Sequence, residues 1–295
     1  MTTSVTTKVT TIDLGDGAYQ ITAAGAGSSV LFLHGFSGSR HDWAPFVANV
    51  ASANMAIAAD LLGHGGSWRP TDPDRYRLSR QAADVAALIE RLGAGPAIVV
   101  AYSYGARLAL RIAVDHAALV AGLALESPSA GIADVEERAA RRAADEILAH
   151  DLERDGIDAF VERWAALPLF GGERRLPASV REDLARRRRA NDPSALAAAL
   201  RGAGQGVMTP LHDHLGAIAV PTAILAGALD PAGLARARIV AAGIPGATLD
   251  VLEDVGHAAH REAPDRFAAW LATSIDRITS PSPVLVPSSQ RRRSP

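Results

Sequence analysis

The sequence predicts an α/β protein whose mostly parallel sheet is flanked by helices and carries an all-helical insertion. Short apolar segments rich in β-branched residues alternate with segments whose apolar residues recur at helical spacing. This alternation is typical of a parallel sheet covered on both faces. Between Gly131 and about Gly206 the alternation stops, and the stretch predicts helices without a strand.

Eight strands and several helices follow from these patterns. The predicted strands are Val9–Leu14, Ala18–Ala23, Val30–Leu33, Met55–Ala59, Ala97–Tyr102, Leu119–Leu125, Thr222–Ala226 and Thr248–Leu252. The predicted helices include Arg80–Leu92, Asp134–His150, Ile157–Ala166, Ala178–Arg189, Ser194–Leu200 and Pro264–Ile278. A helical insertion between parallel strands lies over their carboxyl ends, where ligands bind. We therefore expect a core (1–130 and 207–279), a cap (131–206) and a disordered tail (280–295).

Composition excludes several classes of protein and site. A net charge of −2 gives no global electrostatic case for nucleic acid or an acidic membrane. The absence of cysteine excludes disulfides, a thiol nucleophile and cysteine metal sites. No run approaches the roughly 18 apolar residues that span a bilayer, and Met1–Thr11 lacks a signal core. We expect a cytoplasmic enzyme without a metal or cofactor, as a monomer or small homo-oligomer.

The segment Ala101–Ala106 carries the clearest functional signal. It joins the apolar run Ala97–Val100, which is rich in β-branched residues, to a segment whose apolar residues recur at helical spacing. Ser103 has the small residues Ala101 two positions before it and Gly105 two positions after it. A serine at a strand-to-helix junction with small residues two before and two after is typical of a nucleophile elbow. Such a turn holds the hydroxyl above the sheet, at the positive end of the helix. The alternative is an ordinary strand–helix turn that contains a serine.

A serine hydroxyl needs a base, and an imidazole oriented by a carboxylate suits this task. In folds with this elbow the chain order is serine, acid, histidine. Asp230 and His257 each follow a predicted strand in that order. His260 is the second candidate for the base, because it has no strand end of its own. Asp254 is the alternative acid.

An oxyanion requires two backbone donors. One is expected from the N–H of Tyr104, directly after the serine. The other is expected from Phe36, in the glycine-containing loop that follows a buried strand. The alternative for this loop is a structural turn.

These residues together resemble the α/β-hydrolase superfamily. The supporting segments are Leu33-His34-Gly35-Phe36, Asp60-Leu61-Leu62-Gly63-His64-Gly65-Gly66-Ser67, the serine turn, Gly227–Asp230 and Gly256-His257. They span most of the chain. The resemblance implies the α/β-hydrolase fold, with an eight-stranded sheet and an inserted cap.

Within the superfamily the chain is similar to the 2-succinyl-6-hydroxy-2,4-cyclohexadiene-1-carboxylate synthases, lyases of menaquinone biosynthesis. The similar segments include Phe32–Ser39 with Asp42-Trp43, Tyr102–Leu110, Leu125–Ile132, Trp164 with Pro168–Phe170, Leu200–Gly206 and His257–Pro264. Positions that match substrate-binding residues of that family are His34, Tyr102, Arg107, Arg141, Trp164 and Arg188. Guanidinium groups bind carboxylates through paired hydrogen bonds, which suits a small anionic substrate.

The chain also departs from the family pattern. Ala101 and Ala106 replace commoner glycines around the serine turn. Pro231-Ala232-Gly233 stands where a charged and an aromatic residue are usual, and His212 where tryptophan is frequent. The arginines of the cap are balanced by about as many acidic residues, so the cap is not a basic lid.

The resemblance implies a lyase that eliminates pyruvate from 2-succinyl-5-enolpyruvyl-6-hydroxy-3-cyclohexene-1-carboxylate, with Ser103 acting as a base. A first alternative is a serine hydrolase of the same fold that cleaves an ester or a carbon–carbon bond of a diketone. A second is a non-catalytic ligand-binding protein. Arginines aimed at Ser103 favour the anionic substrate, whereas an apolar tunnel favours an ester.

Overall fold

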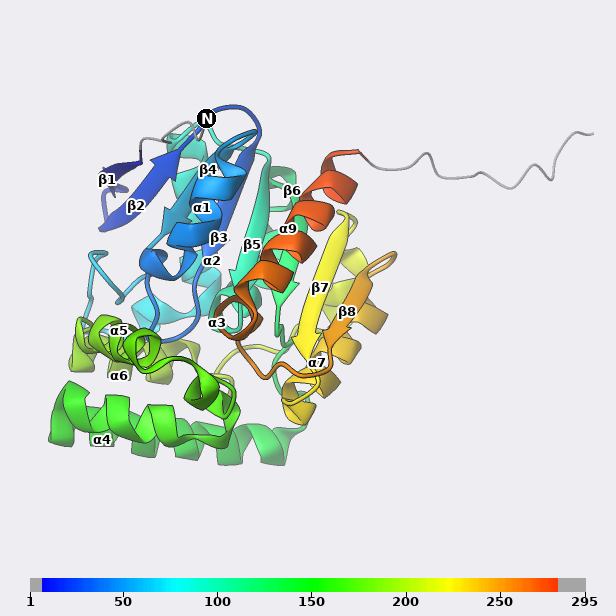
Figure 1. Ribbon diagram of the computed structural model, residues 1–295. Coiled ribbons are helices and arrows are strands. Elements are labelled where there is room, and N and C mark those ends of the chain that lie inside the picture. The colour runs from blue at the N-terminus through cyan, green and yellow to red at the C-terminus, as the bar shows by residue number, and fades with distance from the viewer. Residues whose placement is uncertain (1–6, 281–295) are drawn as a thin grey trace, which may run out of the picture.

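A computed structural model describes residues 7–280, which form one eight-stranded sheet with helices on both faces (Figure 1). The strands are β1 (Lys8–Asp13), β2 (Ala18–Ala24), β3 (Ser29–Leu33), β4 (Met55–Ala59), β5 (Ala97–Tyr102), β6 (Val120–Glu126), β7 (Thr222–Gly227) and β8 (Thr248–Leu252). All eight predicted strands are present, to within one residue at each end. The predicted tail, from residue 281 onward, lies outside the described residues.

The order of the strands across the sheet is β1-β2-β4-β3-β5-β6-β7-β8. β2 runs antiparallel to β1 and β4, and every other pairing is parallel. The carboxyl ends of β3 and β5 to β8 therefore meet at one edge, where residues from distant parts of the sequence are brought together. This confirms the predicted α/β-hydrolase fold class.

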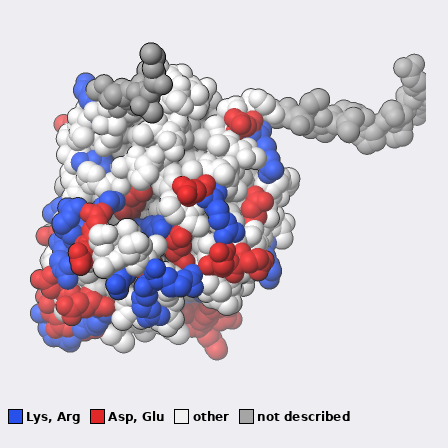
Figure 2. Space-filling model, viewed as in Figure 1, with Lys and Arg blue, Asp and Glu red and all other residues white. Residues whose placement is uncertain are grey.

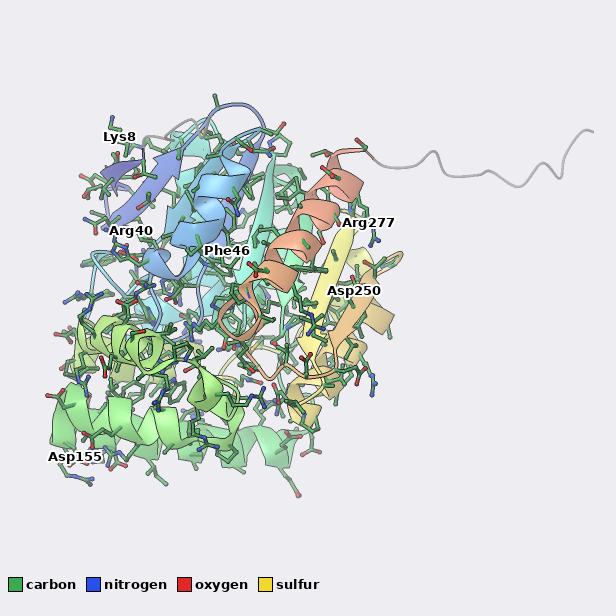
Figure 3. The ribbon with its side chains drawn as sticks, in the orientation of Figure 1. Lys8, Arg40, Phe46, Asp155, Asp250 and Arg277 are labelled. Carbon is green, nitrogen blue, oxygen red and sulfur yellow. The ribbon has the colours of Figure 1, made fainter. Side chains whose placement is uncertain are left out.

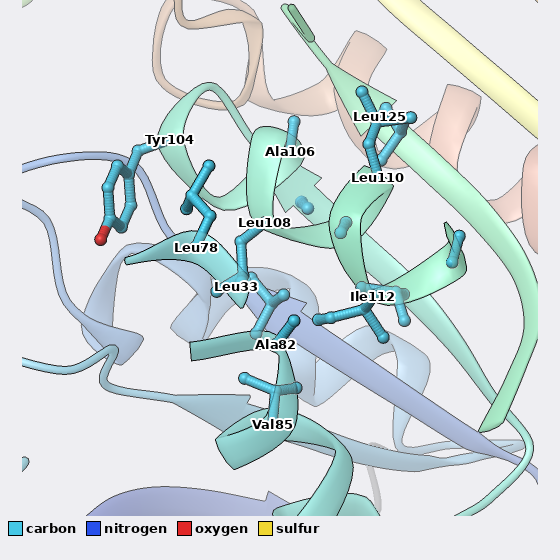
Figure 4. Close-up of a cluster of buried hydrophobic side chains, with 14 of the residues drawn as sticks. Leu33, Leu78, Ala82, Val85, Tyr104, Ala106, Leu108, Leu110, Ile112 and Leu125 are labelled. Carbon is cyan, nitrogen blue, oxygen red and sulfur yellow. The ribbon is translucent and has the colours of Figure 1, made fainter. Parts of the chain in front are cut away.

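The helices divide between the two faces of the sheet. They are α1 (Ala44–Val50), α2 (Leu78–Arg91), α3 (Tyr104–Asp115), α7 (Pro231–Gly243), α8 (Ala259–Glu262) and α9 (Pro264–Thr279). Side chains of α2, α3 and α7 share one buried cluster with Leu31 and Leu33. Figure 4 shows the part of this cluster in which side chains of α2 and α3 lie near Leu33. Those of α1 and α9 share a second cluster with Val30 and Phe32. Alternate residues of β3 thus serve opposite faces, and Phe46 of α1 faces α9 (Figure 3).

Short 3₁₀ helices complete the described elements. They are η1 (Arg40–Trp43), η2 (Pro73–Tyr76), η3 (Ala117–Leu119), η4 (Pro168–Phe170), η5 (Glu173–Arg175) and η6 (His212–Ala217). Within the described residues, none of the helices has both the length and the apolar character needed to cross a bilayer.

The insertion consists of α4 (Val135–Ala166), α5 (Ala178–Arg189) and α6 (Pro193–Ala203), which gather at one edge of the sheet (Figure 1). Gly156 breaks α4 with a φ of 78°, where two separate helices are predicted, although the first helix extends further than His150. The cap has a small core of its own, which includes Leu152, Phe160 and Leu196. Its surface mixes basic and acidic side chains, as Figure 2 shows.

A buried charge cluster joins the cap to the core. Arg261 of α8 donates to Asp42 of η1 at 2.9 Å and to Glu173 of η5 at 2.7 Å. Arg188 of α5 donates to the same Glu173 carboxylate at 2.8 Å. All four side chains are less than a tenth exposed. Because each charge has a partner of opposite sign, the cluster can be buried without leaving an isolated ion.

We expect Asp42→Asn to lower the free energy of unfolding at pH 7 by roughly 3 kcal/mol, because it leaves Arg261 short of one buried partner. Burial raises the pKa of Asp42, but Arg261 and nearby cations outweigh it and lower this pKa from 3.8 to about 2. Its stabilisation is thus present above pH 4 and is lost as the pH falls towards 2. Urea denaturation of both proteins should therefore show a difference that shrinks across this window.

The exposed pair Asp74–Arg77 offers a matched control. Asp74→Asn should change the free energy of unfolding by less than about 0.5 kcal/mol at either pH. A loss at Asp42 that is equally small, or that does not change with pH, would contradict a stabilising role for the cluster.

Candidate active site

Ser103 lies at the sharp turn between β5 and α3, with a φ of 49° and a ψ of −102°. A non-glycine residue seldom adopts a positive φ, and such strain persists only where neighbouring contacts enforce it. The Ser103 N–H donates to the carbonyl of Glu126 on β6 at 2.9 Å. A Cβ at Gly105 would lie 2.4 Å from the carbonyl oxygen of Leu33, so only glycine allows α3 to start this close to β3.

The turn brings the serine to a histidine and a carboxylate from two other strand ends. The Ser103 Oγ lies 2.9 Å from His257 Nε2, and His257 Nδ1 lies 2.6 Å from Asp230 Oδ2. Asp230 follows β7 and His257 follows β8. With Nδ1–H donating to the carboxylate, Nε2 is free to accept the serine proton, which is the arrangement of a Ser-His-Asp triad.

The environment keeps Asp230 ionised. Burial raises the pKa of Asp230, but the hydrogen bond from His257 and the N–H of Gly233 outweigh it and lower this pKa below its ordinary value. The Gly233 N–H donates to Asp230 Oδ1 at 2.9 Å. The carboxylate therefore holds the histidine tautomer and can stabilise its protonated form.

The alternative base and acid considered from the sequence, His260 and Asp254, lie away from Ser103. His260 Nδ1 lies 2.7 Å from Glu126 Oε2, and its N–H donates to Glu126 Oε1 at 3.0 Å. Asp254 is exposed and pairs with Arg266. Neither contacts Ser103 or His257, so the structure brings only His257 and Asp230 to the serine.

Glu126 and Ser127 also support the histidine loop, which sequence reasoning did not foresee. The Ser127 Oγ donates to the carbonyl of His257 at 2.9 Å. The Tyr102 ring lies between His257 and His260, with ring centroids 5.3 and 4.7 Å apart. The end of β6 thus fixes the backbone of one histidine and the side chain of the other.

A cavity of about 120 Å³ opens above Ser103, between the sheet edge and the cap. Core residues and cap residues both line it. They are Phe36, Tyr102, Ser103, Tyr104, Arg107, Ser127, Pro128, Ser129, Arg141, Trp164, Leu169, Phe170, Ala199, Leu200, Ala203, Gly204, Gln205, Gly233, Arg236, His257 and Arg261. The lining contains four arginines and no aspartate or glutamate.

Arg107 and Arg141, two of the arginines predicted to bind substrate, line the cavity and differ in their protein partners. Arg107 is buried and donates to the carbonyl of Ala203 at 2.7 Å, and the described residues give it no carboxylate partner. Burial lowers the pKa of Arg107 to about 10, so it stays charged at neutral pH. Arg141 of α4 donates to Asp145 at 2.8 Å through Nε alone, which leaves the outer nitrogens for another acceptor.

The aromatic residues predicted for the pocket, Tyr102 and Trp164, also line the cavity. The Trp164 ring packs against Phe36 and Phe170, with centroids 5.4 Å away in each case. Its Nε1 is buried without a hydrogen-bond partner among the described residues. An unpaired buried donor at a cavity wall is available to a ligand.

Two predicted binding residues do not line the cavity. His34 is fully buried and accepts from the Leu61 N–H at 2.9 Å, and its other ring nitrogen lies 2.7 Å from the Gly35 carbonyl. Arg188 pairs with Glu173, in the charge cluster, and lies behind the ring of Phe170 at 5.2 Å. In the structure His34 instead holds the loop after β3, and Arg188 belongs to the link between cap and core.

The two residues predicted to donate to the oxyanion, Phe36 and Tyr104, both belong to the cavity lining. Tyr104 is the first residue of α3, so its N–H has no acceptor within the helix. The Tyr104 hydroxyl is anchored on Gln81, 2.7 Å from Nε2. This fixes the start of α3 relative to α2.

Comparison with known proteins agrees with this geometry. Residues 30–270 match the alpha/beta hydrolase family. The chain belongs to the α/β-hydrolase family. It is 34% identical over 239 residues to the 2-succinyl-6-hydroxy-2,4-cyclohexadiene-1-carboxylate synthase of Salmonella typhimurium (strain LT2), covering 80% of this chain and 89% of that protein. A Bacillus subtilis (strain 168) protein provisionally given the same name is 32% identical over 270 residues, 90% of this chain and 98% of that protein.

Solved structures of this α/β-hydrolase fold include the MenH protein of S. aureus. It superposes with a TM-score of 0.84 at 28% identity and covers 88% of this chain and 99% of that chain. An esterase from Thermogutta terrifontis has a TM-score of 0.79 at 24% identity, covers 94% of this chain and 100% of that chain, and shares the fold. The resemblance found in the sequence is thereby confirmed, and the chain is an enzyme of this superfamily.

The described residues contain no group of three or more histidine, aspartate or glutamate side chains that could hold a metal ion.

We expect a serine-directed phosphonate to label Ser103, because His257 activates its hydroxyl. Ser103→Ala should abolish labelling, and His257→Ala should slow it by a factor on the order of 10³. Mass spectrometry of the labelled peptide gives the site and the rate. His150→Ala, on the exposed cap surface, should label at the wild-type rate, and equal rates for His150→Ala and His257→Ala would contradict the triad.

Gly233→Ala should also impair the site, because a Cβ there would lie 1.9 Å from Asp230 Oδ2. The displaced carboxylate would no longer orient His257, so phosphonate labelling should slow by about tenfold or more. Gly216→Ala is the matched control, since no atom lies within 4 Å of its added Cβ. If both variants label alike, the position of Asp230 does not depend on Gly233.

Proposed function

We propose that this enzyme eliminates pyruvate from 2-succinyl-5-enolpyruvyl-6-hydroxy-3-cyclohexene-1-carboxylate to give 2-succinyl-6-hydroxy-2,4-cyclohexadiene-1-carboxylate. The observation that carries the proposal is the cavity above Ser103, lined by four arginines and no acidic residue. This substrate bears three carboxylates, and guanidinium groups bind carboxylates through paired hydrogen bonds. The names of the relatives in Salmonella typhimurium and Bacillus subtilis support the same reaction.

The reaction begins at C2 of the ring, whose hydrogen is acidic because the succinyl ketone is attached there. The Ser103 oxygen takes this proton while its own proton passes to His257 Nε2, 2.9 Å away. The ketone oxygen then carries developing negative charge. The N–H groups of Phe36 and Tyr104 stabilise this charge without reorganisation.

Elimination follows from the electrons left at C2. They form the C2–C3 double bond, and the C3–C4 double bond moves to C4–C5. The C5–O bond breaks, and enolpyruvate leaves as an enolate that takes the proton held by His257 and becomes pyruvate, which returns the imidazole to its neutral form. The bonds formed and broken balance without an oxidant, a metal or a water molecule.

Hydrolysis of an ester on the same triad is the second candidate. The hydrogen bonds from Ser103 through His257 to Asp230 suit acyl transfer equally well. Fold alone does not separate the two reactions, since one fold supports many chemistries. The arginine lining favours the lyase.

Pyruvate release from the proposed substrate, coupled to lactate dehydrogenase, tests the proposal beside hydrolysis of p-nitrophenyl esters. We expect rapid pyruvate release and slow ester hydrolysis, with Ser103→Ala lowering kcat for pyruvate release by a factor on the order of 10³. Fast ester hydrolysis without pyruvate release would establish a hydrolase. Absence of both activities and of phosphonate labelling would indicate a ligand-binding protein.

Arg141→Gln should raise KM for the anionic substrate by roughly tenfold while changing KM for a neutral ester less than twofold. Asp145→Asn is the matched control, because it removes the acid paired with Arg141 and leaves the guanidinium in place. That variant should keep or lower KM for the anion. Equal effects of Arg141→Gln on the charged and neutral substrates would contradict carboxylate binding by Arg141.

A further inference from the structure

Arg236 of α7 lines the cavity although nothing in the sequence marked it as a binding residue. It follows Asp230 by six residues, in the helix that starts directly after that carboxylate. Gly233 is the other residue of α7 that lines the cavity. The side of the cavity beside Asp230 is therefore formed by a glycine and an arginine.

Helix geometry explains why the arginine reaches the cavity. Residues three apart lie on one face of a helix, and a helical side chain points back over the turn that precedes it. The turn preceding Arg236 contains Gly233, which has no side chain to occupy that space. The guanidinium can thus extend towards the amino end of α7, where Asp230 meets His257. Arg236 also helps to lower the pKa of Asp230, which places its charge near the triad.

The Arg236 guanidinium is available to a ligand as far as residues 7–280 are concerned. Among residues 7–280, no hydrogen bond or ion pair involves its side chain, although it is only partly exposed. By contrast, Arg261 binds two carboxylates, of Asp42 and Glu173, and is neutralised within the protein. Arg141 retains part of its donor capacity, and Arg107 has no carboxylate partner within these residues.

We propose that Arg236 binds one carboxylate of the substrate and, with Arg107 and Arg141, completes a set of three arginines for three carboxylates. The inference rests on the proposed function and deepens it. The resemblance assigned the third position to Arg188, but that side chain pairs with Glu173 away from the cavity. Arg236 supplies the third positive charge from α7 of the core, whereas Arg188 belongs to the cap.

Arg236→Ala tests this inference, with Arg238→Ala as the matched control because Arg238 is an exposed arginine of the same helix. A charge-assisted hydrogen bond contributes enough that its loss should raise KM for the proposed substrate by roughly tenfold to hundredfold. Arg238→Ala should leave KM within about twofold. Arg236→Lys should be intermediate, because it keeps the charge and loses the paired donors.

The split between KM and kcat distinguishes substrate binding from support of the triad. A substrate-binding arginine changes KM and leaves kcat within about threefold near pH 8, where Asp230 is ionised in either protein. A large fall in kcat with unchanged KM would assign Arg236 to positioning Asp230 and would overturn the proposal. Equal KM values for Arg236→Ala and Arg238→Ala would overturn it as well.

A second readout separates this inference from the proposed lyase activity. Tricarballylate, a small tricarboxylate, should protect Ser103 from phosphonate labelling, and its neutral trimethyl ester should not. Arg236→Ala should weaken protection by tenfold or more. If pyruvate release fails while this protection persists, the lyase proposal falls and the anion site at Arg236 stands. Protection that is unchanged in Arg236→Ala would overturn the role of Arg236 whatever the reaction.

Discussion

The left-handed backbone of Ser103 is the constraint on which the rest of the site depends. Serine adopts this conformation only because several contacts enforce it together. The Ser103 N–H is bound by Glu126 of β6, and Gly105 allows α3 to start against the carbonyl of Leu33 on β3. The turn that contains Ser103 and Gly105 thus fixes β3, β5 and β6 relative to one another. The same turn places Ser103 at the cavity and makes Tyr104 the first residue of α3, so that the Tyr104 N–H has no acceptor within the helix.

Carboxylates from neighbouring strands give two nearby histidines different roles. Asp230, after β7, orients His257 towards Ser103, whereas Glu126, at the end of β6, holds His260 by both its backbone and its ring. Chemically the two imidazoles are alike, and they are three residues apart. The register of β6 and β7 in the parallel sheet therefore decides which of the two histidines can act as the base.

Much of the fold and the triad could be predicted because both depend on local patterns. Runs of β-branched residues reveal where the strands lie in the sequence. Ser103, Asp230 and His257 each follow such a strand, so the sequence itself places them at the carboxyl ends of the sheet. Arginines are different, because a long side chain can reach several partners. Arg188 matches a binding position by alignment, yet a carboxylate fifteen residues earlier, Glu173, captures it. Such a choice depends on tertiary packing that no spacing in the sequence records.

The electrostatics of the cavity arise from the placement of the acids rather than from an excess of basic residues. The chain has a net charge of −2, and the cap surface carries both signs (Figure 2). The carboxylates that pair with the lining arginines, Asp42, Asp145 and Glu173, all lie outside the lining. The partners of Arg141 and Arg261 therefore lie outside the cavity lining, and Arg107 and Arg236 have no carboxylate partner among residues 7–280. A protein that is nearly neutral overall can in this way place cationic side chains beside a serine. Under the proposed function, the placement of these cations rather than the triad determines which substrate is bound.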